Sequence, residues 1–405
     1  MTKLFESNNK IKTNNCTGCA ACNNTCPSMA ISMSEDSEGF PYPTIDAEKC
    51  TGCGLCEKKC PVMYRENLPR NREKPDVYAA WHNDLEIRMR SSSGAAFTAL
   101  ARTILDKQGR VYGAAFDKQF LVYHKAVDDL EGLEELRRSK YAQSSIGDSF
   151  FQTKRDLKQN RIVLFTGLSC QIAGLYAYLG RNYDNLFTCS LICKGVPSPK
   201  VFRRYLDYLE EYYGSSVISY SFRDKRFGWG PNEAVLFANG QEKLSNSSKH
   251  EALYYYAFAT KSLFLRPSCY TCSFKGLPSV ADITIADFWS IRKQEPKWDD
   301  NRGTSLIIVN SNKGNDLLAN SQSELSIHLC SLDYIAGNSN FFRSSPRPRN
   351  RERFFKDLDQ LPFKLIIEKY MTPPNALIQS VLKHVKYIKS LFKKLIGRES
   401  RIRND

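Results

Sequence analysis

The chain has 405 residues, of which 42% are hydrophobic and 25% are charged. This balance is typical of a globular protein with one large core, or with a medium core and small modules. The chain has no run of eighteen apolar residues and no apolar signal core at its N-terminus, so we expect neither a membrane-spanning helix nor secretion. Fourteen cysteines in a cytoplasmic chain then indicate metal or redox chemistry rather than disulfides.

The net charge of +15 is concentrated near the C-terminal end. Residues 343–405 contain 16 lysines and arginines and 6 acidic residues, which accounts for +10 of the +15. A basic segment of this kind suits a membrane surface, a nucleic acid or plain solvent. The excess is a property of the tail and not of the whole surface, and we do not expect nucleic acid as the partner.

Residues 1–68 hold two copies of one cysteine motif. Each copy reads Cys-x2-Cys-x2-Cys-x3-Cys-Pro, the pattern of bacterial dicluster ferredoxins. The first copy holds Cys16, Cys19, Cys22 and Cys26, and the second, shifted by 34 residues, holds Cys50, Cys53, Cys56 and Cys60. Zinc and disulfides are the alternatives, but two matching copies with prolines have no common zinc counterpart.

In such a motif three thiolates of one loop hold a cubane iron–sulfur cluster, and the fourth cysteine reaches across to the other cluster. We therefore predict two [4Fe-4S] clusters with crossed ligands. The first cysteine set is Cys16, Cys19, Cys22 and Cys60, and the second cysteine set is Cys50, Cys53, Cys56 and Cys26. Clusters of this kind carry single electrons and rarely act on substrates, so the motifs indicate how electrons arrive but not what they do.

A polar, proline-containing linker at residues 66–76 separates the motifs from alternating strands and helices that continue to about residue 340. The predicted strands are 77–82, 110–116, 121–127, 161–167 and 185–193, and the predicted helices are 91–109, 170–180 and 199–214. Each predicted helix ends at a glycine, a common helix stop. The pattern predicts an α/β or α+β domain.

Six cysteines lie outside the two motifs. Cys170 opens a predicted helix, where the helix dipole stabilises a thiolate, and Cys193 ends a predicted strand. Cys269 and Cys272 form an isolated Cys-x2-Cys pair, which by itself fits a zinc clip, a redox disulfide or chance. The two cysteines expected in the core are Cys189 and Cys330.

Seven segments between residues 10 and 345 carry a family resemblance. They are SSSGAAFTAL, SKYAQSSIGD, VLFTGLSCQIAGL, ICKGVPSPKVF, SFRDKRFGW, CYTCSF and DITIADFW. Together they resemble the beta subunit of coenzyme F420 hydrogenase/dehydrogenase, and more closely its bacterial relatives that are linked to polysaccharide biosynthesis and carry a fused dicluster ferredoxin. The resemblance implies an FAD-containing domain with a [4Fe-4S] cluster of its own. The implied ligands, called the third cysteine set here, are Cys170, Cys193, Cys269 and Cys272, with zinc at the same positions as the alternative.

The chain departs from the family pattern at three places. Leu168 and Ser169 stand where relatives commonly have Thr-Pro, and Ala95 stands where relatives often have a second glycine. Ser290 stands where relatives have a glycine after DFW. These departures leave the implied cluster ligands intact and bear on the flavin contacts and on the use of the deazaflavin coenzyme.

Two polar segments are the candidate flavin contacts. The turn SSSGAAFT presents hydroxyl groups and a glycine at a helix start, where backbone amides can cradle a phosphate; an ordinary helix cap is the alternative. The segment SKYAQSS can hydrogen-bond isoalloxazine or pyrophosphate, with a solvated turn as the alternative. The predicted flavin-binding residues are Ser92, Ser93, Gly94, Lys140, Tyr141, Gln143 and Ser144. A Gly-x-Gly-x-x-Gly fingerprint is absent.

Two further groups of residues are candidates for a site. The charged and aromatic stretch from Arg223 to Trp229 can hold an anionic cofactor or substrate, or is a solvated face. Asp282 and Asp287 alternate with apolar residues, so an inward acid near the cofactor is expected from this segment. No histidine has the spacing of a metal ligand, and no catalytic residue is assigned.

We therefore predict an α+β protein in three parts. A dicluster ferredoxin domain at residues 1–68 is followed by a mixed α/β domain for FAD and a [4Fe-4S] cluster at 69–345, and by a basic linker and helical tail at 346–405. Within the tail, residues 377–396 repeat apolar positions with helical spacing opposite a lysine-rich face. Such a helix suits anionic lipid or a partner protein, with packing on the protein's own core as the alternative.

The predicted function is electron transfer between a ferredoxin-like or other redox partner and a small-molecule substrate. The [4Fe-4S] clusters would carry single electrons, and FAD would convert them into two-electron chemistry. The alternative is an electron-transfer adaptor without a substrate site of its own. The predicted location is the cytoplasm, including the inner face of the membrane.

Overall fold

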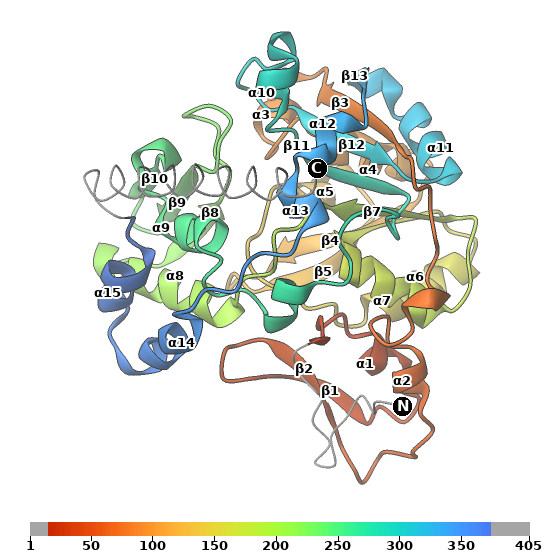
Figure 1. Ribbon diagram of the computed structural model, residues 1–405, viewed down its shortest axis with the longest axis horizontal. Coiled ribbons are helices and arrows are strands. Elements are labelled where there is room, and N and C mark those ends of the chain that lie inside the picture. The colour runs from red at the N-terminus through yellow and green to blue at the C-terminus, as the bar shows by residue number, and fades with distance from the viewer. Residues whose placement is uncertain (1–14, 374–405) are drawn as a thin grey trace, which may run out of the picture.

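The computed structural model describes residues 15–373, so the predicted amphipathic helix at 377–396 lies outside the described residues. Figure 1 shows a small N-terminal module below a large sheet, with a smaller sheet and the last helices beside them. Within residues 15–373, no helix combines the length and the apolar character needed to cross a membrane.

The N-terminal module consists of two short helices and a β-hairpin. The elements are α1 (Ala21–Thr25), β1 (Ile31–Glu35), β2 (Pro41–Ile45) and α2 (Leu55–Lys58). The two strands pair antiparallel, with Ile31 opposite Ile45. Each helix begins after a residue in the left-handed conformation, Ala20 at φ 58° and Gly54 at φ 69°. The chain therefore turns sharply within each cysteine motif, and η2 (Arg65–Asn67) leads on to the main domain.

An eight-stranded mixed sheet forms the centre of the main domain, in the order β13-β3-β12-β11-β7-β6-β4-β5. Its parallel middle consists of β4 (Arg110–Phe116), β6 (Val163–Leu168), β7 (Leu186–Leu191) and β11 (Ile283–Asp287). The antiparallel strands are β3 (Asp76–His82), β5 (Val122–Val127), β12 (Ser305–Val309) and β13 (Leu325–Cys330). The middle strands are apolar and largely buried, as expected of parallel strands that are covered on both faces.

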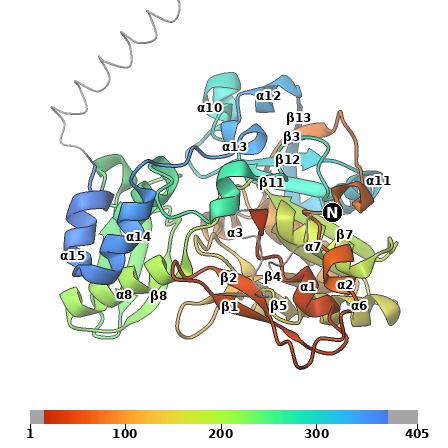
Figure 2. The same cartoon turned by 60° about the horizontal axis from the view of Figure 1, so that its bottom comes forward.

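Helices cover both faces of this sheet. One core contains α4 (Ala96–Leu105), α5 (Leu130–Leu136) and α11 (Asn312–Asn320), and another contains α6 (Ser149–Lys158) and α7 (Ser169–Leu179). The second core also includes Cys19, Ala20 and Ala21, so α1 of the N-terminal module packs directly on α7 (Figure 2). The predicted helix at 91–109 begins only at Ala96, because Ser91 to Gly94 form a turn.

A smaller antiparallel sheet packs beside the main sheet. Its strands are β8 (Val217–Ser221), β9 (Glu233–Phe237) and β10 (Glu242–Ser245), and the helices around it are α8 (Pro199–Tyr213), α9 (Leu253–Tyr255), α14 (Arg351–Gln360) and α15 (Phe363–Ile366). Their common core is rich in aromatic side chains. Helix α14 begins inside the stretch that the sequence analysis takes as a linker, because Phe354, Phe355 and Leu358 give it a buried face.

Short elements complete the described chain. The helices are α3 (Leu85–Met89), α10 (Ile291–Gln294), α12 (Asp333–Ala336) and α13 (Ser339–Phe342). The 3-10 turns are η3 (Ser247–Lys249), η5 (Pro267–Thr271), η6 (Pro296–Trp298) and η7 (Gln322–Glu324), and the π turns are η4 (Tyr256–Thr260) and η8 (Ile367–Met371). The predicted fold class, a small N-terminal module followed by a mixed α/β domain, is confirmed.

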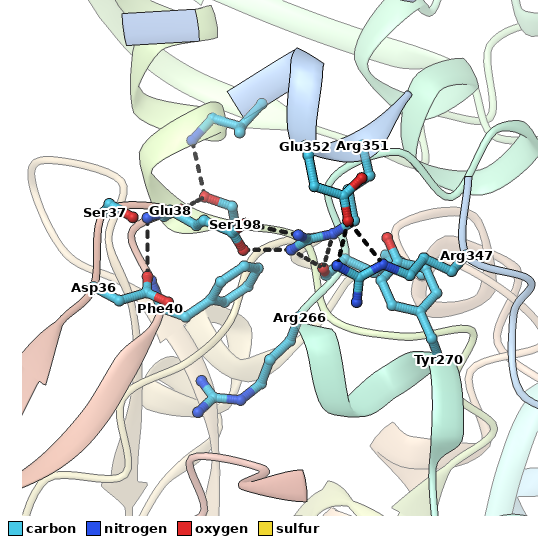
Figure 3. A network of polar contacts seen from close by, with 12 residues as sticks. Asp36, Ser37, Glu38, Phe40, Ser198, Arg266, Tyr270, Arg347, Arg351 and Glu352 are labelled. Atoms are coloured by element: carbon cyan, nitrogen blue, oxygen red, sulfur yellow. Dashed lines mark hydrogen bonds and ion pairs between the residues drawn. The ribbon is translucent and has the colours of Figure 1, made fainter. Parts of the chain in front are cut away.

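The turn of the β1–β2 hairpin attaches the N-terminal module to the main domain at a second place (Figure 3). Both terminal nitrogens of Arg351, in α14, form an ion pair with the carboxylate of Glu38. The hydroxyl of Ser198 donates to the backbone carbonyl of Glu38 at 2.5 Å. A Cβ at Gly39, whose φ is 80°, would collide with Lys200. The hairpin is therefore held between α8 and α14.

Candidate functional site

The first cysteine set lies between the N-terminal module and α7. Burial, and next the neighbouring thiols of the set, raise the pKa of Cys22 well above its usual range. Those neighbours are Cys19, Cys16 and Cys60. Burial also raises the pKa of Cys19 to about 12. The structure thus brings together three cysteines of the first motif and the last cysteine of the second, and buried thiols of this kind suit a cluster whose positive charge stabilises the thiolates.

The second cysteine set lies at the surface. Cys50 and Cys53 are exposed, and the other two members are half-buried. Burial acts to raise the pKa of Cys26, but hydrogen bonds from the Ser28 hydroxyl and the backbone N–H of Ala30 outweigh it and lower the pKa. These donors lie 3.6 and 3.3 Å from the sulfur. One side of the set is therefore open to solvent and to other molecules.

The third cysteine set surrounds one small cavity. Its members are Cys170 in the first turn of α7, Cys193 after β7, and Cys269 and Cys272 in and directly after η5. Burial, and next the other three thiols, raise the pKa of Cys170 well above its usual range. The backbone N–H of Val196 donates to Sγ of Cys269 at 3.3 Å, and that of Phe274 donates to Sγ of Cys272 at 3.4 Å.

The geometry of these sets bears on what they could bind. Among residues 15–373, no three histidine, cysteine or acidic side chains come close enough together to hold a single metal ion. A cubane cluster takes its thiolates at separate corners, and its sulfur ligands accept hydrogen bonds from nearby N–H groups. Four thiols around one cavity, two of them with backbone N–H donors, are a ligand set that suits a cluster.

The three sets are adjacent to one another in space. Helix α1, which carries Cys22, packs on α2, which carries Cys56. Gly174 of α7 faces Cys19: a Cβ at Gly174 would lie 2.9 Å from Cβ and 3.1 Å from Sγ of that cysteine. Beyond burial, the Cys19 thiol also adds to the effects that raise the pKa of Cys170. The order from the surface inward is therefore the second set, the first set and the third set.

A large cavity of about 360 Å³ lies beyond the third set, at the carboxyl ends of β6, β7 and β11. Ligands of open α/β sheets bind at this edge, and the volume is that of a small-molecule site. The large cavity shares wall residues with the cavity of the third set, namely Leu168, Leu191, Ile192, Cys193, Gly195, Val196 and Asn340. A molecule bound in the large cavity would therefore lie next to the third set.

The predicted flavin-binding residues divide into two groups. Those that line the large cavity are Ser92, Ser93, Lys140, Tyr141 and Ser144. Gly94 lies behind the wall, where a Cβ would collide with the backbone of Ala80 and Ser305. Gln143 turns away toward the N-terminal module, and its Oε1 accepts a hydrogen bond from Arg266 at 3.0 Å. The structure therefore places Gly94 and Gln143 as supports of the cavity and not in its wall.

Two departures from the family pattern are visible in the backbone. Ala95 has a φ of 68°, a left-handed conformation that favours glycine. The backbone N–H of Leu168 donates to Oε1 of Gln171 at 2.9 Å, so the start of α7 is capped although the expected Thr-Pro is missing. Both helices that begin at the large cavity therefore start with residues other than those common in the family.

The wall of the large cavity carries buried positive charge. Arg223 is paired with Asp287, whose carboxylate oxygens lie 2.6 and 2.8 Å from the guanidinium. Lys140 donates to the backbone carbonyls of Arg137 and Arg138, and within residues 15–373 no carboxylate pairs with it. Burial, and next the charge of Arg138, lower the pKa of Lys140 to about 7. A half-buried lysine that has no carboxylate partner among residues 15–373 suits an anionic ligand such as a pyrophosphate.

The inner wall also contains polar residues that the sequence pattern does not single out. Nε2 of His124 lies 3.1 Å from the carbonyl oxygen of Thr166, and burial lowers the pKa of His124 to about 4, so its ring is neutral at pH 7. Gln171 donates to the hydroxyl of Ser144 at 2.8 Å. Thr166 and Gln171 flank the carboxyl end of β6, so the rule that ligands bind at strand ends could have found them.

Of the two candidate acids, only Asp287 lines the large cavity. Its carboxylate accepts a hydrogen bond from the indole N–H of Trp229 at 2.8 Å, and Trp229 stacks on Trp289 with ring centroids 4.3 Å apart. Asp282 precedes β11 at the opposite end of the strand and accepts from the backbone and hydroxyl of Thr188 at 2.9 and 2.8 Å. Asp282 therefore fixes the sheet and does not face the cavity.

Comparisons with known proteins relate two parts of the chain to known families. Residues 160–334 match the family described as the C terminus of the coenzyme F420 hydrogenase/dehydrogenase beta subunit, and residues 15–63 match the 4Fe-4S dicluster domain. No curated protein sequence matches the chain. A chain of the F420-reducing [NiFe] hydrogenase complex from Methanosarcina barkeri, solved after xenon derivatization, aligns with a TM-score of 0.44 and 17% identity over 75% of this chain and 94% of that chain. The two family matches confirm the predicted resemblance to the beta-subunit family and the predicted dicluster domain.

Proposed function

Since the chain joins a 4Fe-4S dicluster domain to the C-terminal region of the coenzyme F420 hydrogenase/dehydrogenase beta-subunit family, we propose that the protein is an iron–sulfur flavoprotein oxidoreductase. It passes electrons between a one-electron carrier protein and a two-electron small-molecule substrate. The observation that carries this proposal is the order of the three cysteine sets, which leads from the surface to the wall of the large cavity.

The proposal gives each group of residues a task. The three cysteine sets hold three [4Fe-4S] clusters, and the large cavity holds FAD. FAD exchanges two electrons with organic substrates and single electrons with clusters. Ser92 and Ser93 precede the N-terminus of α4, where backbone amides favour a phosphate. Lys140 supplies the positive charge that the pyrophosphate of FAD requires.

The wall shared by the third set and the large cavity is largely apolar. Leu191, Ile192 and Val196 contribute apolar side chains to it, and Cys193 belongs both to this wall and to the third set. A flavin bound against this wall would cover Leu191, and the exclusion of solvent would strengthen electrostatic interactions on both sides.

The second cysteine set is the docking point for the carrier protein in this proposal. Residues 47–53 are exposed almost throughout and include Cys50 and Cys53. Burial raises the pKa values of Cys19 and Cys22 in the first set and of Cys170 in the third set, so these thiols lie farther from solvent than Cys50 and Cys53. A ferredoxin-like protein that approaches residues 47–53 would come closer to this set than to either of the others.

Anaerobic purification followed by iron, sulfide and flavin analysis tests the proposal. Three clusters and one flavin predict roughly twelve irons and one FAD per chain. Replacing Cys170 by serine should remove about four of these irons. The control is Cys330→Ser, which changes a half-buried cysteine outside the three sets and should keep all the iron. Eight irons and no flavin in the unchanged protein would contradict the proposal.

A further inference from the structure

Arg266 is a buried arginine that joins the first cysteine set to the main domain. It directly precedes η5, the turn that carries Cys269, and its side chain is fully buried. The guanidinium points toward the first set: Nε donates to the carbonyl of Cys16 at 2.7 Å, and Nη2 lies 3.6 Å from Sγ of the same residue. Nη1 donates to Oε1 of Gln143 at 3.0 Å, and the ring of Tyr42 lies 4.0 Å from the guanidinium carbon.

The charge of Arg266 has no acidic partner within residues 15–373: its hydrogen bonds go to a carbonyl, an amide and a sulfur. Arg351 is an equally buried arginine that holds the same hairpin, as Figure 3 shows, but it is paired with Glu38. A buried charge is strongly unfavourable unless another charge compensates it. Among the hydrogen-bond partners of Arg266 in residues 15–373, only the sulfur of Cys16 can carry negative charge.

The backbone of the first motif makes room for this arginine. Gly18 has a φ of 68°, and a Cβ there would lie 2.8 Å from Nη1 of Arg266 and 2.5 Å from Nε2 of Gln143. The same glycine donates its N–H to Sγ of Cys16 at 3.4 Å. The motif loop therefore offers the sulfur of Cys16 two kinds of donor, a backbone amide and a guanidinium, and any larger residue at position 18 would displace the second.

We propose that Arg266 is the counter-charge of the first cysteine set and raises the reduction potential of the cluster that this set holds. A cubane held by four thiolates is negatively charged, and reduction adds one more negative charge. A cation that donates to a ligand sulfur stabilises the reduced form more than the oxidised form. The inference rests on the proposed function for the presence of the cluster, but it concerns only the role of Arg266.

The position of Arg266 gives this role a consequence for electron flow. The first set lies between the exposed second set and the buried third set. A raised potential at this place would favour the step from the second set to the first and would hold the electron there until the third set or the flavin accepts it. Gln143, held by Arg266, lies one residue from Ser144 in the wall of the large cavity, so the same arginine also fixes the chain that borders the flavin site.

The test compares the midpoint potentials of three anaerobically purified variants by EPR-monitored redox titration. Arg266→Gln should lower the equilibrium constant for reduction of one cluster at least tenfold. For a one-electron couple this corresponds to a midpoint potential lower by about 59 mV. Arg266→Lys, which keeps the charge but loses the planar fork, should recover part of this shift. Arg351→Gln loosens the same hairpin without touching a sulfur and should leave all the cluster potentials unchanged.

Iron and flavin are counted in the same samples, so that failure of the proposed function is recognised separately. Unchanged potentials in Arg266→Gln at full iron content would overturn the inference, and so would an equal shift in Arg351→Gln.

A second measurement needs no variant: unchanged protein that contains ¹⁵N-guanidinium arginine should show ¹⁵N coupling to a reduced cluster by pulsed EPR. Absence of that coupling in iron-loaded protein would overturn the inference even where the variants fail to fold. Unchanged protein without iron would overturn the inference together with the proposed function.

Discussion

The two cysteine sets of the N-terminal module have nearly the same sequence and very different surroundings. The first set faces α7, with Cys19 in the core and Arg266 against Cys16. The second set ends at the surface, with Cys50 and Cys53 exposed. Both loops follow the same cysteine spacing 34 residues apart. The difference between the two sets therefore comes from tertiary packing. The first set faces the main domain, and the second set faces solvent.

The comparison shows how two copies of one motif can differ in function because their surroundings differ. A ligand loop determines which cluster is held, whereas solvent, hydrogen bonds and nearby charge tune its potential. At the first set these influences come from η5 and α7 of the main domain, and at the second set from solvent. The following predictions test this difference between the surroundings of the two sets.

The largest expected effect is on the thermal stability of the protein when one of the two sets loses its cluster. Cys19→Ser and Cys53→Ser should each lose about four irons, but only Cys19→Ser should strongly destabilise the protein. Cys19 packs in the core beneath α7, where lost cluster binding is also lost folding energy. We expect Tm to fall by about 5–10 °C more for Cys19→Ser than for Cys53→Ser in anaerobic calorimetry. Equal Tm values for the two variants would contradict the claim that the first set contributes more to folding stability than the second set.

A smaller effect is expected where α7 meets the first set. Gly174→Ala places a methyl group 3.1 Å from Sγ of Cys19, which should destabilise the protein by about 1–3 kcal/mol in denaturant unfolding. An alanine in a helix interior ordinarily stabilises relative to glycine, so a loss at this position identifies the contact. Gly337→Ala is the control, because nothing lies within 4 Å of its new Cβ, and its effect should stay within about 0.5 kcal/mol. A stabilised Gly174→Ala protein would show that the contact is loose.

The smallest effect concerns the large cavity at the inner end of the path. The pKa of Lys140 is about 7 without a ligand, and an anionic cofactor would raise it, so binding takes up a proton above pH 7. The affinity of flavin-free protein for FAD should therefore be constant below pH 7 and fall by up to tenfold per pH unit above it. Titration of flavin-free Lys140→Met protein with FAD should show weaker binding, and the affinity should not fall with pH above pH 7. An unchanged slope in Lys140→Met would assign the proton to another group.

Much of this architecture was predictable from local patterns. The strands at β3, β4, β5, β6 and β7 and the helices α7 and α8 were expected within a few residues, because apolar runs and glycine stops are local signals. The cysteine spacing likewise predicts crossed ligand sets; Cys60 acts on the thiol of Cys22, while the place of Cys26 in the second set stays a prediction. The order of eight strands could not be predicted, since pairing between β3 and β13 joins residues far apart in sequence.

The site was less predictable where a residue acts through a distant partner. Gln143 lies in a polar segment that suggested a flavin contact, yet its partners are Thr17 and Arg266, both more than 120 residues away. Arg266 itself carries no local signal, because its partner Cys16 is 250 residues away. The charged stretch before Arg351 suggested a linker, and burial of the next turns against α8 outweighed that composition.

The central claim is that one chain connects three clusters and a flavin. Anaerobic titration of the purified protein with a one-electron reductant, followed by visible absorption and EPR, tests it most directly. One electron for each cluster and two for the flavin predict an end point of roughly five electrons per chain, with flavin bleaching and cluster reduction in the same titration. An end point of about two electrons, without a flavin signal, would show that only the N-terminal dicluster module carries electrons and would contradict the account.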